Sequence, residues 1–267
     1  MKNLFENKII YRVIIAIISL YVLIAFVKLP PINGYKRAMF SEMIDGTAWK
    51  PFVYRTLLPT TVRIFSEVIP ESVHSSLTER VESKKSAMLV LEKFKWESEF
   101  ITEYLVAMVL MYLSLLGFVF AFRKLFDEIY NSTLWFKNII SIILLLAIPA
   151  MFQPQYSNYI YDFPTLFLFT LGLLLLKKRN WKIFLILFFI ACLNKETIIL
   201  LTLIFAIHFY KDAEVSRKLY YQLLGAQLIL FGAVKILLYI LFVNNPGGFV
   251  EFHLIDRNYL LFNGYSL

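Results

Sequence analysis

The sequence predicts an all-α, polytopic helical membrane protein, and three observations support that prediction. Hydrophobic residues make up 59% of the 267 residues, and the mean hydropathy is +0.67. Charged residues make up only 17%, whereas a soluble domain usually carries about 25%. Several apolar stretches reach the roughly 20 residues that a helix needs to cross a bilayer. We therefore expect about seven transmembrane helices, two of them short and paired, in one integral membrane domain over residues 1–267.

The expected spans follow the apolar runs of the chain in order. The first run follows Lys2 and Lys8 and lacks a small-residue cleavage site, which favours a retained anchor over a signal peptide. Short basic or polar turns separate most of the later runs. The expected spans are 9–27, 101–122, 139–152, 159–176, a broken run at 181–210, and 219–242.

Residues 28–99 are too polar to span, and we expect them to form a helical first outer loop at the membrane interface. The first part of the loop is half apolar and is punctuated by Pro, Gly and Arg, which is typical of short helices lying in the interface. The second part, "ESVHSSLTERVESKKSAMLVLEKFKWESEF", mixes charges of both signs and predicts one or two solvated helices. The tail at 243–267 is also too polar to span, and we expect it on the outer side.

The run at 181–210 raises a question, because Lys195 and Glu196 stand in its middle, where charges are costly. If the run were one helix, the basic stretches "KKRNWK" and "KDAEVSRK" would lie on opposite sides of the membrane. If the chain breaks at Asn194 and returns, the N-terminus and the basic loops after residues 122, 176 and 210 all face one side. That arrangement obeys the positive-inside rule. We therefore expect a reversal near Asn194, with the N-terminus cytoplasmic and the protein in the inner (cytoplasmic) membrane.

Charge and cysteine usage exclude several classes of function. The net charge of +8 is explained by topology. Because no run alternates basic and aromatic residues, we expect no nucleic-acid partner. The single cysteine, Cys192, excludes a disulfide within the chain. The three histidines are far apart and show no ligand spacing, so no zinc site is expected.

The expected topology gathers polar side chains on the outer side. On the fourth span, Asn158, Asp162 and Thr165 share one helix face by their spacing. We expect the "NKET" segment to point into an outer cavity, where it meets the polar groups of the first loop and of that face. The expected set is Glu42, Asp45, Arg55, Gln153, Gln155, Tyr156, Asn158, Asp162, Asn194, Lys195 and Glu196.

The stretch "YIYDFPTLFLFTLGLLLLKKRNWKIFLILFFIACLNKETIILLTLIF" resembles the middle of multi-spanning glycosyltransferases of the GT-C superfamily. The shared features are an acidic residue opening a helix (Asp162), a basic turn with an aromatic (177–182), a polar break with a lysine (194–197), and a short returning helix. The segment "YRTLLP", which begins at Tyr54, is similar to a "YRxLxP" element of bacterial membrane proteins of that type. The resemblance covers roughly residues 9–210.

The resemblance implies transfer of a sugar from a polyprenyl-phosphate donor to a cell-envelope glycan, lipid or protein at the outer face. That superfamily places a catalytic carboxylate in the first outer loop, which implies Asp45 as the base that deprotonates the acceptor. Arg55 and Lys195 would hold the phosphate, and Tyr54 and Asn194 are further candidate substrate-binding residues. Glu42, Asp162 and Glu196 would position sugar or acceptor, or bind a divalent metal, so the cofactor is left open. The superfamily often carries an adjacent acidic pair after the first span, whereas Glu42 and Asp45 are separated by two residues, and the base remains open between them.

Each assignment also has a structural alternative. Asp45 could instead belong to a loop turn, and Arg55 could extend its side chain to the lipid head groups. Lys195 and Glu196 could form a structural ion pair. Asp162 could cap its helix before Pro164. The protein as a whole also fits a transporter or flippase subunit, because broken helices with charges mark transporters. A non-catalytic membrane partner of a cell-envelope complex is a third class.

Overall fold

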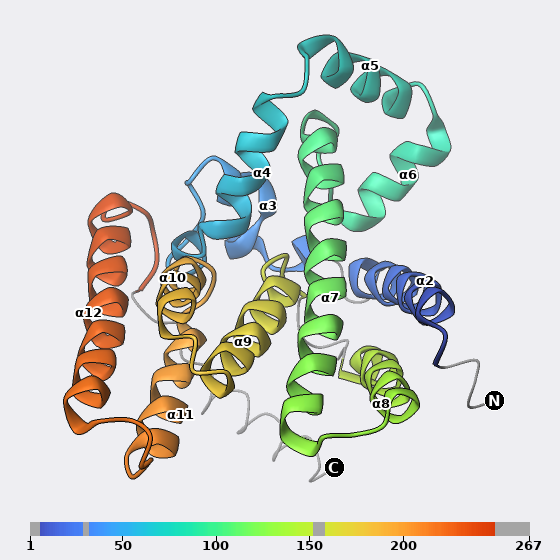
Figure 1. The fold of residues 1–267 in the computed structure, drawn as a ribbon. Coiled ribbons are helices and arrows are strands. Elements are labelled where there is room, and N and C mark those ends of the chain that lie inside the picture. The colour runs from blue at the N-terminus through green and yellow to red at the C-terminus, as the bar shows by residue number, and fades with distance from the viewer. Residues whose placement is uncertain (1–5, 29–31, 152–157, 249–267) are drawn as a thin grey trace, which may run out of the picture.

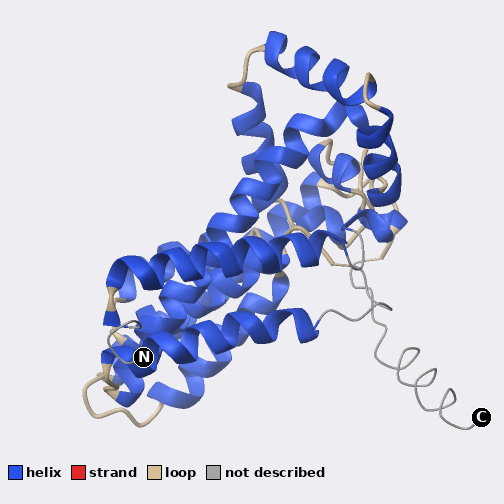
Figure 2. Cartoon of the chain, turned by 90° about the vertical axis from the view of Figure 1, so that its right-hand side faces the viewer, coloured by secondary structure: helices blue, strands red, loops and turns tan. Residues whose placement is uncertain are grey.

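The computed structural model of the chain describes residues 6–28, 32–151 and 158–248, which form helices joined by short connections, with no β-strand (Figures 1 and 2). The all-α prediction is therefore confirmed for the described part of the chain. The α-helices are α2 (Lys8–Lys28), α3 (Phe40–Ile44), α4 (Leu57–Glu67), α5 (Glu71–Glu82), α6 (Lys85–Phe94), α7 (Ile101–Tyr130), α8 (Leu134–Ala147), α9 (Asp162–Lys177), α10 (Trp181–Cys192), α11 (Leu200–Phe209) and α12 (Arg217–Leu241). Short 3₁₀ turns join or extend them, among them η3 (Phe52–Tyr54), η4 (Ser98–Phe100), η5 (Ile148–Met151) and η6 (Glu196–Ile199).

Four helical segments in the described residues are long and apolar enough to cross a membrane: Lys8–Lys28, Ser98–Tyr130, Leu134–Met151 and Arg217–Leu241. Much of their surface is apolar and uncovered by protein, as shown by Ile229 of α12, which is 72% exposed. Lipid chains are the solvent that such a surface fits. The chain thus has the character of a multi-pass membrane protein. By length, α9 and the two short helices α10 and α11 fall below this criterion, so it supports four of the seven expected spans.

Helix α7 continues about two turns past the expected end of its span at residue 122 and stops at Tyr130. The extra turns carry Asp127 and Glu128, which pair with Lys137 at 2.7 Å and with Lys178 at 2.8 Å. Polar contacts with neighbouring turns thus extend the helix beyond its apolar part. Asn131 then takes a left-handed conformation (φ 44°) and ends it.

The expected reversal of the run 181–210 is present. Helix α10 ends at Cys192, Lys195 is extended (φ −159°, ψ 142°), and η6 resumes at Glu196. The ring of Trp181, at the start of α10, lies 5.2 Å from that of Phe209, at the end of α11. Helices α10 and α11 are therefore antiparallel neighbours, and not two halves of one straight helix.

The basic turns lie together at one end of the molecule. Arg179, between α9 and α10, pairs with Asp212, between α11 and α12, at 2.9 Å. The ion pair of Lys178 with the last turns of α7 adds the α7–α8 connection to the same end. The start of α2 joins them, because the Tyr11 hydroxyl lies 2.8 Å from that of Ser141 on α8. Helices α5 and α6 lie at the opposite end (Figure 1), where the sequence predicts one or two helices, and most of their side chains are not buried by the rest of the chain.

Two glycines allow close packing around α9. A Cβ on Gly117 of α7 would come within 2.7 Å of the Phe167 ring on α9, and a Cβ on Gly172 of α9 would come within 2.5 Å of Leu201 on α11. Helix α7 has its most extensive contact with α9, and Gly117 brings the two together as small residues do between membrane helices. This contact places the start of α9 next to the first loop.

Hydrogen bonds tie the first loop to the end of α10 and to the segment that follows α12. The Leu57 amide donates to the carbonyl of Leu193, at the end of α10, at 3.0 Å. The Asn245 side chain, just beyond α12, donates to the carbonyls of Gly46 and Ala48 at 2.8 and 2.9 Å. These bonds hold the loop over the break between α10 and α11 and against the end of α12.

Candidate functional site

Arg55 is a buried arginine that forms an ion pair between the first loop and the break with the partly exposed Glu196. Its Nη2 donates to Oε1 of Glu196 at 2.8 Å, and its Nη1 donates to the Tyr161 hydroxyl. The guanidinium stands 5.0 Å from the Phe52 ring and 4.4 Å from the Tyr161 ring. Arginine suits this position, because its flat cation stacks on aromatic faces while its edge binds a carboxylate. Its burial, at 8% exposure, argues against the snorkelling alternative.

A second ion pair lies beside the first. The Lys195 ammonium donates to Oδ1 of Asp162 at 3.0 Å, and it stands 5.2 Å from the Tyr161 ring. The other carboxylate oxygen of Asp162 accepts the Tyr159 amide at 3.0 Å. Asp162 therefore joins the turn before α9 to the lysine of the break, but α9 begins without a side-chain cap, so the helix-cap alternative is not observed.

Asn194 fixes the break against α9. Its Nδ2 donates to the Tyr161 carbonyl at 3.2 Å and to the Thr165 hydroxyl at 2.8 Å. Asn194 is 1% exposed, and no described residue donates to its Oδ1. The amide thus binds the break to Thr165, which shares α9 with Asp162. Asn158, the third residue of the predicted helix face, precedes α9, which begins at Asp162, so it does not share that face.

Two residues of this cluster were not predicted. Tyr161 is fully buried and contacts both cations, but its sequence context, "NYIYDF", does not distinguish it from tyrosines of an interfacial belt. Lys235 lies on α12 within electrostatic range of Glu196. Its signal was present in the sequence, because a lysine inside an apolar helix is costly, as each charge at the break is.

Lys235 differs from the other two cations in its partners. Its ammonium stands 5.6 Å from the Phe231 ring, and it forms no hydrogen bond or ion pair with the residues that the structure describes. Arg55, Lys195 and Lys235 thus face Asp162 and Glu196, which leaves the cluster with one excess positive charge. We call these five side chains and Tyr161 the charged cluster.

The two candidate bases lie outside the charged cluster. Asp45 is the exposed residue that ends α3, and no interaction among the described residues joins it to the cluster. Glu42 lies on α3, where burial and then the negative charge of Glu97 raise the pKa of its carboxyl. Its buried Oε2 has no hydrogen-bond donor among the described residues. The catalytic roles of Asp45 and Glu42 remain predictions.

Helix α12 links the charged cluster to the loop that carries Asp45. Lys235, Tyr239 and Phe242 share one face of this helix by their spacing. The Phe242 ring lies 6.5 Å from that of Tyr54, which is buried. A Cβ on Gly46, next to Asp45, would lie 3.3 Å from the same Phe242 ring. Asp45 therefore lies near the C-terminal end of α12, roughly 10 Å along the helix axis from Lys235.

Of the remaining sequence-predicted groups, the structure describes Asn158 alone. Gln153, Gln155 and Tyr156 lie outside the described residues. Asn158 is buried and donates to the Phe26 carbonyl at 2.7 Å, which ties it to α2. Among residues 6–28, 32–151 and 158–248, no three His, Cys, Asp or Glu side chains gather as a metal site would require.

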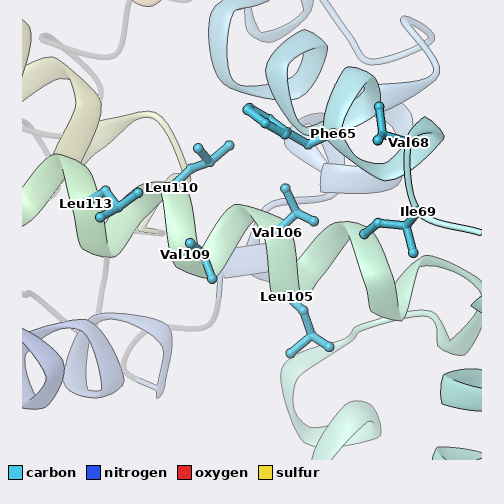
Figure 3. Close-up of a pocket in the computed structure, with 8 residues that line it drawn as sticks. All are labelled: Phe65, Val68, Ile69, Leu105, Val106, Val109, Leu110 and Leu113. Atoms are coloured by element: carbon cyan, nitrogen blue, oxygen red, sulfur yellow. The ribbon is translucent and has the colours of Figure 1, made fainter. Parts of the chain in front are cut away.

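An apolar groove runs beside α4, whose N-terminus follows Arg55. Figure 3 shows its outer part, a pocket of about 500 Å³ in which side chains from the end of α4 face those of α7. A second pocket, of about 260 Å³, shares Leu110 and Leu113 with the first and includes Leu57, two residues after Arg55. The lining of the outer pocket is Phe65, Val68, Ile69, Leu105, Val106, Val109, Leu110 and Leu113. We call the two pockets together the α4–α7 groove.

No protein family model, curated protein or solved structure matches the chain.

Proposed function

We propose that the chain is a membrane glycosyltransferase of the GT-C type, which moves a sugar from a polyprenyl-phosphate donor to an acceptor of the cell envelope. The observation that carries the proposal is the charged cluster, with its excess cation, next to the α4–α7 groove. A lipid-linked sugar phosphate joins the same two properties, an anionic group and a long apolar chain.

The free donors of the cluster support phosphate binding. Each Arg55 terminal nitrogen donates once, to Glu196 or to Tyr161, and keeps a second N–H that no described residue accepts. The Lys195 ammonium donates to Asp162 and keeps further N–H groups. Lys235 is unpaired among the described residues. In our proposal, Lys235 supplies the excess positive charge, and Arg55 and Lys195 bind the phosphate with their remaining donors.

The reaction in this proposal is a displacement at the sugar carbon that bears the phosphate. Asp45 takes the proton of the acceptor hydroxyl, the acceptor oxygen bonds to that carbon, and the bond to the phosphate oxygen breaks. The phosphate leaves with the bonding pair as polyprenyl phosphate, and the cations of the cluster stabilise its charge. Glu42 is the alternative base, since burial and the charge of Glu97 raise its pKa and make its carboxylate a stronger proton acceptor than an ordinary glutamate.

The orientation of the chain belongs to the same proposal. Because the N-terminal segment and three basic turns share one end, the positive-inside rule favours the cytoplasm for that end. The charged cluster and the first loop would then face the outside of the inner membrane. Helix α9 and the antiparallel pair α10 and α11 would complete seven membrane segments, with the break buried in protein.

Binding of a short-chain polyprenyl phosphate to the detergent-purified protein tests the proposal. Lys235→Gln and Lys195→Gln should each weaken binding by about tenfold, the scale of one charge-assisted contact. Lys218→Gln, on the exposed first turn of the same helix as Lys235, is the matched control and should bind as the parent does. If both cluster variants fold and bind as tightly as the parent, neither lysine is a phosphate ligand and the ion pairs are structural.

Turnover separates an enzyme from a transporter or a scaffold. The broken pair α10 and α11 with charges at the break also fits a flippase of lipid-linked sugars. Asp45→Asn should abolish sugar transfer and leave donor binding intact. In liposomes, movement of the lipid-linked sugar across the bilayer that Asp45→Asn does not affect, without any transfer product, would favour the flippase.

A further inference from the structure

A second pocket for a ligand lies at the end of the molecule that carries the basic turns. It has a volume of about 610 Å³ and is bounded by α2, α7 and α8. Four cations line it: Lys8 and Arg12 from α2, and Arg123 and Lys124 from α7. All three helices belong to segments long and apolar enough to cross a membrane, so the pocket lies between the ends of membrane-spanning segments.

The charge of this pocket is not balanced by its own lining. No Asp or Glu lines it among the described residues. The nearest acids along α7, Asp127 and Glu128, are engaged by Lys137 and Lys178. Cations that converge in a concave site raise one another's energy and focus a positive potential on it. A bound anion would relieve that repulsion.

The Arg123 guanidinium is held in place, as a binding group should be. Its Nε donates to Oδ1 of Asn138 on α8 at 2.5 Å, and its charge stands 5.4 Å from the Tyr11 ring. The bond uses Nε and leaves the terminal nitrogens of the guanidinium for a ligand. An arginine oriented in this way suits a phosphate group, which it can bind through two parallel hydrogen bonds.

The lining changes from charged to apolar along both helices. On α2 the cations are followed, one turn deeper, by Ala16. On α7 the cations are preceded, toward the middle of the span, by Phe120 and Leu116. A phosphate with apolar chains matches this gradient, with its headgroup among the cations and the start of its chains against the apolar residues. A free phosphate would leave the apolar part uncovered.

We propose that this pocket binds the phosphate headgroup of an anionic membrane lipid. Basic pockets between transmembrane helices bind such headgroups in general. The pocket is lined by the ends of α2 and α7 that lie with the basic turns, and it shares no residue with the charged cluster. The proposal is therefore independent of the proposed enzymatic function.

Lipid binding to the detergent-purified full chain tests the proposal in three arms. The probes are short-chain phosphatidylglycerol, phosphatidylcholine with the same chains, and inorganic phosphate. We expect phosphatidylglycerol to bind at least about tenfold more tightly than phosphatidylcholine. Equal binding of the two lipids would overturn the proposal. Binding of inorganic phosphate as tight as that of phosphatidylglycerol would overturn the lipid assignment in favour of a free-phosphate site.

Two double variants locate the binding. Arg12→Gln with Lys124→Gln removes two exposed cations of the pocket and should weaken phosphatidylglycerol binding roughly 30-fold. Arg217→Gln with Lys218→Gln removes two exposed cations from the start of α12 and should change it less than about twofold. Both variants keep the Arg123–Asn138 contact, and a parental circular dichroism spectrum checks the fold. An equal loss in both would show that net charge attracts the lipid, and would overturn the pocket assignment.

Discussion

The ion pair between Arg55 and Glu196 should be one of the most important polar contacts for stability, and Glu196→Gln tests this. The substitution keeps the shape of the side chain and an acceptor for Arg55, but it removes the charge. Arg55 would stay buried, with 9% of its side chain exposed. Three cations of the cluster would then face Asp162 alone.

The expected magnitude follows from burial. Removing one partner of a buried pair costs about 3–5 kcal/mol. The Glu196 side chain is 42% exposed, so water compensates part of the lost charge, and the glutamine oxygen still accepts a hydrogen bond. We therefore expect a loss of about 2 kcal/mol. For a chain of this size, that corresponds to a melting temperature lower by about 4–8 °C.

The matched control is Glu67→Gln. Glu67 pairs with Arg63 at 3.2 Å, but both side chains are more than half exposed, at 65% and 57%. Such a pair within one helix contributes only about 0.3–0.5 kcal/mol. The two variants therefore make the same chemical change in a buried and in an exposed pair.

Cys192 provides the assay. It is the single cysteine of the chain and is fully buried, so a thiol-reactive fluorophore reports its exposure on heating in detergent. Circular dichroism on the same samples distinguishes global unfolding from a local opening near the break. A Glu196→Gln variant that melts within about 1 °C of Glu67→Gln would refute the reasoning, because the buried pair would then contribute no more than an exposed one.

Three further predictions follow from the fold. Glu42→Gln removes a carboxyl whose pKa is raised in the folded chain, so the parent should lose stability relative to this variant as the pH rises above about 4.5, the ordinary value. The two melting temperatures should differ least at about pH 3, where the carboxyl is protonated in both states. A variant less stable than the parent at pH 7 would contradict the stated cause. Single cysteines can be introduced as Lys178→Cys and Arg217→Cys in a chain that lacks the native cysteine. Both should react with an impermeant reagent from the same side of the membrane, because an ion pair joins the two turns that carry them. Labelling from opposite sides would rule out the reversal. Gly117→Ala should destabilise the folded protein by about 1–3 kcal/mol through overpacking between α7 and α9. The control Gly225→Ala adds a methyl group that meets no atom within 4 Å, so thermal melting should show it to be neutral or slightly stabilising. Equal effects of the two variants would mean that close approach at Gly117 is unimportant.

The cluster shows how far sequence reasoning reaches. The cost of charges in the run 181–210 predicts the reversal at the break, and the resulting topology predicts that Arg55, Asp162, Lys195 and Glu196 meet on one side together with Asp45. The structure brings the first four together and leaves Asp45 outside the charged cluster. The cost of a charge in an apolar run applies equally to Lys235, which stands alone in the apolar part of α12. Tyr161 carries no charge, so its place between the two cations depends on packing alone.

The sequence by itself determined the all-helical class, the apolar segments and the position of the break at Asn194. These are local properties, because hydropathy and the cost of a buried charge are read within one segment. Only the tertiary structure decided which cation pairs with which carboxylate. Arg55 could have reached Asp162 as well as Glu196, and the choice depends on the bond from Leu57 to Leu193 that seats the first loop on the break. The tertiary structure also decided the position of Asp45, because the packing of α12 against the loop leaves this residue exposed and apart from the cluster. Such distances depend on contacts between segments that are far apart in the sequence, so they cannot be predicted from one segment alone.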